Sequence, residues 1–420
     1  MPTTPHHLQA VLLATGNELM TGDLVDSNSA WLAKQLTELQ VGVRAKLTVG
    51  DQFEELVWAM TQAIEKAGLV ILTGGLGPTS DDLTRALLAR VSGRPLQRDP
   101  ELLREIEDFF HQLGRTMKPV NRIQAEIPDG AQGLSNPVGT APGIRIEIGA
   151  ATVFALPGVP REMIAMFETH VRPWILQRTP PTTHRISILC CGRGESDLVE
   201  ELAEVIERIR SCPELSFGTR ASDSVIALKL TGPRADELEQ FAREIENRLG
   251  PIAFGRGNST LAEVVTQLLF QRGQSVVVAE SCTAGEIGHE ITTIPGSSQV
   301  FPGGWISYSN EFKHRFLDVP QPVLDSFGAV SDACVLAMAE GALQQSGADW
   351  AIAVSGIAGP GGGSPEKPVG LVYFAVGQPG NLRVFKRTFS NLGRETIRRR
   401  ATLTALNALR LRLLNIEPVE

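Results

Sequence analysis

Short apolar runs alternate with amphipathic stretches over residues 1–172, and this alternation limits the possible folds more than any other feature. The runs LQAVLLAT, VRAKLTVG and LVILTGG are typical of strands, and NSAWLAKQLTELQ and QFEELVWAMTQAIEKAG between them have apolar residues at helical spacing. This order predicts parallel strands covered by helices on both faces. We therefore expect an α/β domain with a doubly wound, mostly parallel sheet, whose ligands bind at the carboxyl ends of the strands.

Two further units follow the first. Residues 173–256 alternate strands (HRISILCCG, SVIALKLTG) with helices (ESDLVEELAEVIERIRS, ADELEQFAREIENRLG), which predicts a small α+β middle module behind a TPPTTH linker. Residues 257–420 open with the helix STLAEVVTQLLFQRG and close with the helix ETIRRRATLTALNALRLRLL. Between them lie the expected strands SVVVAE, GWISYS, WAIAVSG, LVYFAVG and RVFKRTF. This third unit is predicted to be another α/β domain.

Composition excludes several classes of protein. The 420 residues include 39 basic and 47 acidic side chains, a net charge of −8, so direct nucleic-acid binding is not expected. No apolar run reaches the ~18 residues that span a bilayer. The start, MPTTPHHLQAVLLATG, reads as a short tail entering a strand rather than a signal peptide. Five cysteines without metal-ligand spacing favour a reduced, cytoplasmic protein without membrane contact.

The stretch VVVAESCTAGE, residues 276–286, joins a buried strand to an expected helix. Such a turn can present a nucleophile, and free N–H groups at the helix start could hold an oxyanion. Ser281 is the candidate nucleophile, with a helix N-cap as its structural alternative. Cys282 is the second candidate, although a cysteine at such a place is usually packed in the core.

A serine nucleophile needs a base, and the stretch from Tyr308 to Lys313 offers a phenol and an amine. A helix beginning after Tyr308 would direct both into one cleft, where a desolvated lysine can lose its proton near neutral pH. The alternative for Lys313 is a solvated surface lysine. The histidines of this domain are His289, expected on the same helix as Ser281, and His314. A Ser–His–Asp triad that uses one of them is the minor hypothesis.

Two glycine-rich segments suit phosphate groups because glycine lets backbone N–H groups approach an anion. The first, GGLGPTSDDLT, covers residues 74–84 after a buried strand and includes Asp82, and Asp51 follows the preceding strand. On position alone, each aspartate could be a helix N-cap. The second, SGIAGPGGGSPEKPVG, covers residues 355–370. Positive charge near it could come from Lys367, Arg394, Arg398, Arg399 and Arg400, and either Arg394 or Arg398, which share a helix face, is expected to contact the ligand.

These motifs resemble the competence-damage-inducible protein A (CinA) family over nearly the whole chain. AESCTAG, GGWISYSNEFKHRFL, GAVS, AVSGIAGPGGGSPEKPVG and RETIRRRA are similar to the family's C-terminal domain, a nicotinamide mononucleotide (NMN) deamidase. GGLGPTSDDLT, KPVNRIQAEIPDGA, NPVGTAPG and LPGVPREM are similar to its N-terminal half. GGLGPTSDDLT also resembles the glycine-rich signature of molybdopterin-binding domains. The resemblance implies a molybdopterin-binding-like domain followed by a deamidase domain.

For the C-terminal domain the resemblance implies hydrolysis of the NMN carboxamide to the acid and ammonia, with no cofactor. The implied catalytic residues are Ser281, Tyr308 and Lys313, and whether Tyr308 or Lys313 takes the serine proton stays open. The implied substrate-binding residues are Thr283, Gly285, Asn310, Gly356, Gly359, Gly361, Gly362, Arg394 and Arg398.

For the N-terminal domain the resemblance implies hydrolysis of ADP-ribose to AMP and ribose 5-phosphate. Gly74, Gly75, Gly77 and Thr79 would bind the substrate, and Asp51 and Asp82 would hold Mg²⁺, Mn²⁺ or Co²⁺. Asn17 before Glu18 departs from the commoner acidic start of one motif. Both substrates are breakdown products of NAD, which favours a salvage enzyme, expected as a homodimer. The alternatives are a competence or recombination accessory and a molybdopterin-binding protein without N-terminal catalysis.

Overall fold

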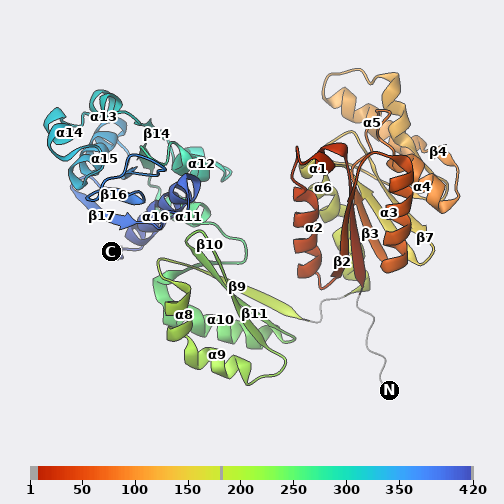
Figure 1. The fold of residues 1–420 in the computed structure, drawn as a ribbon, viewed down its shortest axis with the longest axis horizontal. Helices are drawn as coiled ribbons and strands as arrows, with labels where there is room; N and C mark the ends of the chain where they lie inside the picture. The colour runs from red at the N-terminus through yellow and green to blue at the C-terminus, as the bar shows by residue number, and fades with distance from the viewer. Residues whose placement is uncertain (1–7, 180–182, 418–420) are drawn as a thin grey trace. The chain divides into compact units, whose positions relative to one another are not determined.

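The computed structural model describes residues 8–179 and 183–417 and separates the chain into two compact units, Met1–Thr182 and Thr183–Glu420 (Figure 1). Of the predicted TPPTTH linker, residues 180–182 lie outside the described residues, as do residues 1–7 of the predicted N-terminal tail.

The first unit is built on a six-stranded sheet with helices on both faces (Figure 1). Four neighbouring strands are parallel and the last two pairings are antiparallel, which confirms the predicted doubly wound, mostly parallel sheet. Across the sheet the strands are β2 (Gly42–Val49), β1 (Gln9–Thr15), β3 (Leu69–Thr73), β8 (Ala151–Leu156), β7 (Gly143–Ile148) and β6 (Gln132–Leu134).

Alternation along each strand divides the core of this unit into two halves. In β1, Val11 and Leu13 point to one helical layer, and Ala10 and Leu12 point to the other. The first layer contains α3 (Phe53–Lys66), α4 (Thr84–Ser92) and α5 (Pro100–Gln112). The second contains α2 (Ser27–Glu38), α6 (Pro160–Met166), η2 (Phe167–Val171) and α7 (Arg172–Arg178). Smaller elements are α1 (Asn17–Thr21), η1 (Pro119–Ala125) and the two-stranded ribbon of β4 (Leu96–Arg98) and β5 (Glu126–Pro128).

The helical run from α6 to α7 extends past residue 172, where the sequence analysis places the end of the first domain. Trp174 and Ile175 of α7 are buried in the core half that α2 also covers. Because these side chains pack with the first sheet, the compact unit continues to Thr182.

The second unit begins with an antiparallel four-stranded sheet in the order β10 (Ser216–Ser222), β11 (Val225–Gly232), β9 (His184–Cys191), β12 (Ala253–Arg256). One of its faces packs on α8 (Glu195–Glu201), α9 (Ala203–Arg210) and α10 (Ala235–Leu249). The sequence predicts a single helix over α8 and α9. In the structure this helix is interrupted at Leu202, a buried residue between the two. The edge strands β10 and β12 were not predicted, since β10 is largely exposed and β12 has four residues.

A five-stranded sheet forms the rest of this unit, in the order β14 (Gly303–Ile306), β13 (Val276–Glu280), β15 (Trp350–Gly356), β16 (Leu371–Gln378), β17 (Asn381–Thr388). The strands β14, β13 and β15 are mutually parallel. One face is covered by α11 (Leu261–Arg272), α12 (Glu286–Thr292) and α16 (Arg394–Leu413). The other is covered by α13 (Asn310–Leu317), α14 (Gln321–Phe327) and α15 (Asp332–Ser346), and η3 (Gly250–Ile252) and η4 (Ser297–Gln299) are short turns.

The two sheets of this unit share a core. Leu189 of β9 and Ala227 of β11 belong to the same apolar cluster as residues of α11 and α16. Arg410 of α16, only 2% exposed, donates hydrogen bonds to the Asn407 side chain and the Pro251 carbonyl. The middle module and the domain built on the five-stranded sheet therefore form one compact unit. In the part of the chain that the structure describes, no helix is long and apolar enough to cross a membrane.

Candidate active site

Ser281 lies in a turn at the carboxyl end of β13. Its N–H donates to the Val354 carbonyl of β15 at 2.9 Å, so the turn is tied to the neighbouring parallel strand. Helix α12 begins at Glu286 with Gly285 as its N-cap. The N-cap alternative for Ser281 is therefore wrong, and so is the expectation that His289 shares its helix, because a four-residue turn separates Ser281 from α12.

Lys313 brings an amine onto the candidate nucleophile. Its Nζ lies 3.0 Å from Ser281 Oγ and donates to the carbonyls of Ser307 at 2.7 Å and Tyr308 at 3.4 Å. The side chain is 1% exposed, so the solvated-lysine alternative is wrong. The predicted helix after Tyr308 is α13, capped by Ser309, whose hydroxyl accepts from the Phe312 N–H.

Burial lowers the pKa of Lys313 from its ordinary value, because desolvation penalises the charged ammonium. Its three hydrogen-bond partners are a hydroxyl and two carbonyls, with no carboxylate among them. A neutral amine has two N–H donors and one lone pair. The two carbonyls can take the donors, which leaves the lone pair facing the Ser281 hydroxyl.

Cys282, the neighbouring thiol, is buried and 4% exposed. Desolvation raises the pKa of this thiol to about 12. Since the thiolate is the reactive form, such a cysteine is inert near neutral pH.

Tyr308 and Arg394 form one side of the cavity in front of this pair. The Tyr308 phenol oxygen accepts from an Arg394 Nη at 2.6 Å, and the other Nη donates to the Gly359 carbonyl at 2.8 Å. The cavity has a volume of about 190 Å³. It is lined by Ser281, Cys282, Tyr308, Lys313, Ala329, Val330, Ser355, Gly356, Ala358 and Arg394.

Of the nine residues expected to bind substrate in this domain, Gly356 and Arg394 line the cavity and the other seven do not. Thr283 is fully buried, and its carbonyl accepts a hydrogen bond from Arg398 at 2.9 Å. The Arg398 side chain therefore points to the turn that follows β13. Gly361 and Gly362 lie in an exposed loop, and Asn310 is exposed at the first position of α13. Of Arg394 and Arg398, Arg394 is the one that lines the cavity.

Two of the remaining basic side chains near the second glycine-rich segment, Lys367 and Arg399, are engaged elsewhere. Lys367 donates to the carbonyls of Phe327 at 2.7 Å and Val330 at 2.8 Å. Arg399 pairs with Glu290 on α12. These contacts hold loops and helices together.

The helix-start N–H groups expected to be free for an oxyanion are already occupied. Those of Gly285, Ile287 and Gly288 donate to the buried carboxylate of Glu280, the last residue of β13. The turn amide of Cys282, by contrast, has no backbone acceptor within the described residues, and Cys282 lines the cavity. It is the better oxyanion donor.

Sequence reasoning assigned no role to three contributors to this site: Glu280, Ser307 and Ser355. The Ser307 carbonyl receives the Lys313 amine, and Ser355, on the cavity wall, donates to the Ala329 carbonyl at 2.7 Å. Only Glu280 carried a signal, as a carboxylate ending an apolar run.

The glycine-rich loop of the first unit, between β3 and α4, is held closed by its own contacts. Gly74 has a φ of 107°, and a Cβ there would lie 2.7 Å from the Thr15 carbonyl oxygen, so only glycine fits. Asp82 accepts from the N–H groups of Gly77 and Thr79, each at 2.8 Å, and from the Thr79 hydroxyl. Arg85, 3% exposed, donates to the carbonyls of Leu76 and Gly77.

These contacts change the expected roles of the two aspartates. Neither is an N-cap, because α4 is capped by Leu83 and α3 by Gln52. Asp51 receives the Thr15 hydroxyl on one oxygen and the Asn17 N–H on the other, both at 3.0 Å. Each carboxylate oxygen has two acceptor sites. Asp51 therefore has two acceptor sites left for a cation, one on each oxygen. Asp82, which accepts three hydrogen bonds, has a single acceptor site left.

The described part of the first unit nevertheless has no cluster of three or more side chains of the kinds that usually bind a metal ion. Among residues 8–179 and 183–417, no group of three or more histidine, cysteine, aspartate or glutamate side chains could hold a metal ion. The N–H groups of Gly77 and Thr79, expected to bind phosphate, are already satisfied by Asp82.

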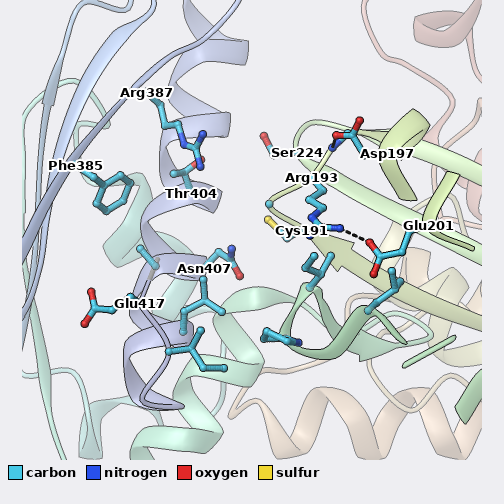
Figure 2. A pocket seen from close by; sticks show the side chains of 18 of the residues that line it. Cys191, Arg193, Asp197, Glu201, Ser224, Phe385, Arg387, Thr404, Asn407 and Glu417 are labelled. Atoms are coloured by element: carbon cyan, nitrogen blue, oxygen red, sulfur yellow. Dashed lines mark hydrogen bonds and ion pairs between the residues drawn. The ribbon is translucent and has the colours of Figure 1, made fainter. Parts of the chain in front are cut away.

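A larger cavity, of about 720 Å³, lies in the second unit between α16 and the middle module. Thr404 and Asn407 line one wall and Cys191 and Arg193 line the other (Figure 2). Arg193 is paired with Glu201 on the same wall. None of the site residues expected from the sequence lines this cavity.

Comparison with known proteins matches residues 258–413 to a family model described as "CinA C-terminal domain" and residues 11–177 to one described as "Probable molybdopterin binding domain". A CinA-like protein of Parasynechococcus marenigrum is 42% identical over 411 residues, covering 96% of this chain and 98% of the relative. A CinA-like protein of Dictyoglomus thermophilum is 38% identical over 413 residues, covering 97% and 100%. The crystal structure of the competence/damage inducible protein CihA from Agrobacterium tumefaciens is 44% identical, covers 37% of this chain and 93% of that chain, and has a TM-score of 0.36.

Proposed function

The chain belongs to the CinA family, and from this premise we propose that its C-terminal domain hydrolyses the carboxamide of nicotinamide mononucleotide, releasing ammonia and nicotinate mononucleotide. One observation carries the proposal: the buried Lys313 amine lies 3.0 Å from the Ser281 hydroxyl at the wall of a small cavity. A serine with a desolvated lysine as its base is a nucleophile suited to amide hydrolysis.

In the first half of the reaction, neutral Lys313 takes the Ser281 proton while Oγ attacks the carboxamide carbon. The carbonyl oxygen becomes an oxyanion, for which the N–H of Cys282, a residue that lines the cavity, is the proposed donor. The Lys313 ammonium then returns the proton to the departing nitrogen. Ammonia leaves and the nicotinoyl group stays esterified to Ser281 Oγ.

In the second half, water attacks the ester and gives a proton to Lys313. Collapse of the second tetrahedral intermediate breaks the bond to Oγ, which recovers its proton from Lys313. The products are the free carboxylic acid and the original enzyme. Lys313 is the preferred base because a phenol with a pKa near 10 is a poor base at neutral pH.

The cavity suits a single ring with its carboxamide. Its volume of about 190 Å³ is below the roughly 300–1,000 Å³ of pockets that enclose most of a drug-sized ligand. The ribose phosphate of NMN would therefore lie outside, beside Tyr308, Arg394 and the glycine-rich loop. Arg394 offers the positive charge there.

Ammonia release from NMN by the full chain in EDTA is the direct test. We expect activity without added metal, because the reacting groups are a hydroxyl and an amine. Nicotinamide without its ribose phosphate should react far more slowly, since remote binding energy is lost. If EDTA abolished the reaction and zinc restored it, the serine mechanism would be wrong.

We further propose that the N-terminal domain cleaves ADP-ribose to AMP and ribose 5-phosphate. The supporting observation is the preformed glycine loop, Gly74 to Asp82, at the carboxyl edge of a parallel sheet, where α/β domains bind ligands. Asp51 is the better of the two proposed cation ligands because it keeps a free acceptor site on each oxygen. A bound divalent cation would supply polarisation of the bridging phosphate.

The N-terminal proposal is tested by measuring AMP from ADP-ribose with Mg²⁺, Mn²⁺ or Co²⁺ and with EDTA. We expect cation-dependent AMP release that Asp51→Asn abolishes. Tight binding of a pterin phosphate without any AMP release would favour the alternative, a molybdopterin-binding protein without N-terminal catalysis.

A further inference from the structure

Glu280 is a buried carboxylate for which the proposed reaction has no direct use. It ends β13, is 0% exposed, and immediately precedes Ser281. Its Oε2 accepts the N–H groups of Gly285 at 2.9 Å and Ile287 at 3.2 Å, and its Oε1 accepts that of Gly288 at 2.9 Å. An ionised carboxylate is costly to bury unless it receives such bonds, so these contacts fix the side chain in one position.

The turn that Glu280 spans has an unusual backbone. Ala284 has a φ of 51° and Gly285 a φ of 92°, so two successive residues adopt the left-handed region. Alanine rarely adopts this conformation, because its Cβ crowds the backbone. The turn is also closed by Ala284 N–H to the Ser281 carbonyl and Glu286 N–H to the Thr283 carbonyl, each at 3.2 Å, and by Arg398, which donates to the Thr283 carbonyl at 2.9 Å. With three N–H groups on its carboxylate, Glu280 makes more of these bonds than any other side chain.

The backbone of Glu280 also supports the base. Its carbonyl accepts the N–H of Ser307 at 2.8 Å, and the Ser307 carbonyl accepts the Lys313 amine at 2.7 Å. The side chain of Glu280 thus fixes the turn of the nucleophile, and its carbonyl fixes the residue that orients the amine.

We infer that Glu280 is a positioning residue that holds Ser281 in line with Lys313 by clamping the left-handed turn between β13 and α12. This inference rests on the proposed deamidase function for its substrate assay. Glu280 does not line the cavity and touches no reacting atom. It acts through the turn, so its loss should lower kcat while leaving KM nearly unchanged.

Glu280→Gln is the central variant, because it keeps the shape but turns one acceptor into an N–H donor facing backbone N–H groups. We expect kcat for NMN to fall about 100-fold, the usual consequence of a misplacement of about 1 Å, with KM changed less than about threefold. Glu290→Gln is the matched control. It removes a carboxylate on α12, the helix whose first N–H groups Glu280 accepts, and this carboxylate pairs with Arg399 and does not contact the turn.

A second measurement separates this inference from the proposed function. A fluorophosphonate reacts with an activated serine whatever the natural substrate, so its rate of labelling Ser281 reports the alignment directly. We expect labelling to slow by a similar factor in folded Glu280→Gln. If the wild-type protein is labelled but does not deamidate NMN, the proposed substrate is wrong. The inference on Glu280 is then decided by whether Glu280→Gln slows the labelling of Ser281.

Ala284→Gly identifies the mechanism, because glycine adopts the left-handed region without strain. Added to Glu280→Gln, it should restore part of the labelling rate, and the double variant also serves if Glu280→Gln alone does not fold. Wild-type kcat and labelling in folded Glu280→Gln would overturn the inference. So would a change confined to KM, or a double variant no faster than the single one.

Discussion

The two loops that follow buried parallel strands, Gly74 to Asp82 in the first unit and Ser281 to Gly285 in the second, use the same parts to different effect. In each, a carboxylate receives backbone N–H groups: Asp82 those of Gly77 and Thr79, Glu280 those of the α12 start. Next to each loop, a buried basic side chain donates to carbonyls: Arg85 to two carbonyls of the first loop, and Lys313 to that of Ser307, outside the second. The backbone device is therefore shared.

The difference lies in the two cations. Desolvation lowers the pKa of both Arg85 and Lys313, but a guanidinium starts too high to give up its proton in the working range. Arg85 can act only as a fixed charge, whereas Lys313 can become a neutral base. A hydroxyl stands against the lysine at 3.0 Å. The second loop therefore differs from the first by one titratable group and one nucleophile.

Removing the nucleophile should produce the largest effect, because it leaves the second loop with only its backbone device. We expect Ser281→Ala to lower kcat/KM for NMN by a factor on the order of 10³ or more, measured as ammonia release. Cys282→Ala is the control and should cost far less, since its buried thiol stays protonated. A reversal of the two results would make this a thiol enzyme.

Giving the second loop the cation of the first should cost nearly as much. Lys313→Arg keeps the charge but cannot accept the serine proton, so we expect a loss on the order of 10² or more, close to that of Lys313→Ala. In the wild type, kcat/KM should rise with pH as Lys313 loses its proton, at a pH below lysine's ordinary pKa because burial lowers it. An active Lys313→Arg enzyme would show that the residue supplies only charge.

Breaking the clamp of the first loop should affect only the first unit. Asp82→Ala removes the acceptor of Gly77 and Thr79, so we expect ADP-ribose cleavage to fall roughly 100-fold, as for other misplacements. NMN deamidation should stay near the wild-type level. Parallel loss of both activities in a folded variant would mean that the two loops are coupled or serve one reaction.

The smallest effect is expected at the rim of the cavity in front of Ser281. Tyr308→Phe removes the hydrogen bond from Arg394, and bonds of this charged kind contribute about 1.5–3 kcal/mol. Because Tyr308 is exposed, we expect a loss at the low end of that range, about tenfold. The kcat/KM of this variant should exceed that of Lys313→Arg across pH 6 to 10. If Tyr308→Phe were the slower of the two, the phenol rather than the amine would be the base.

Periodicity predicted the scaffold because it depends on local sequence. The strand runs ending at Thr73 and Glu280 and the helices between strands appear where apolar spacing places them. Three kinds of feature escaped this reasoning. Leu202 breaks a helix without a glycine or proline to signal it, β10 is an exposed edge strand, and α7 continues a helix across the expected domain boundary.

The sequence by itself determined the family, the doubly wound first sheet and the candidacy of Ser281, Tyr308 and Lys313, because strand periodicity, helix spacing and motif order are local properties of the chain. Only the tertiary structure decided which groups meet. Ser281 and Lys313 are 32 residues apart, and their contact depends on β13 and β14 lying side by side. The clamp by Glu280 and the turning away of Arg398 were likewise decided in space, because hydrogen bonds follow distance and burial, which residue spacing does not encode.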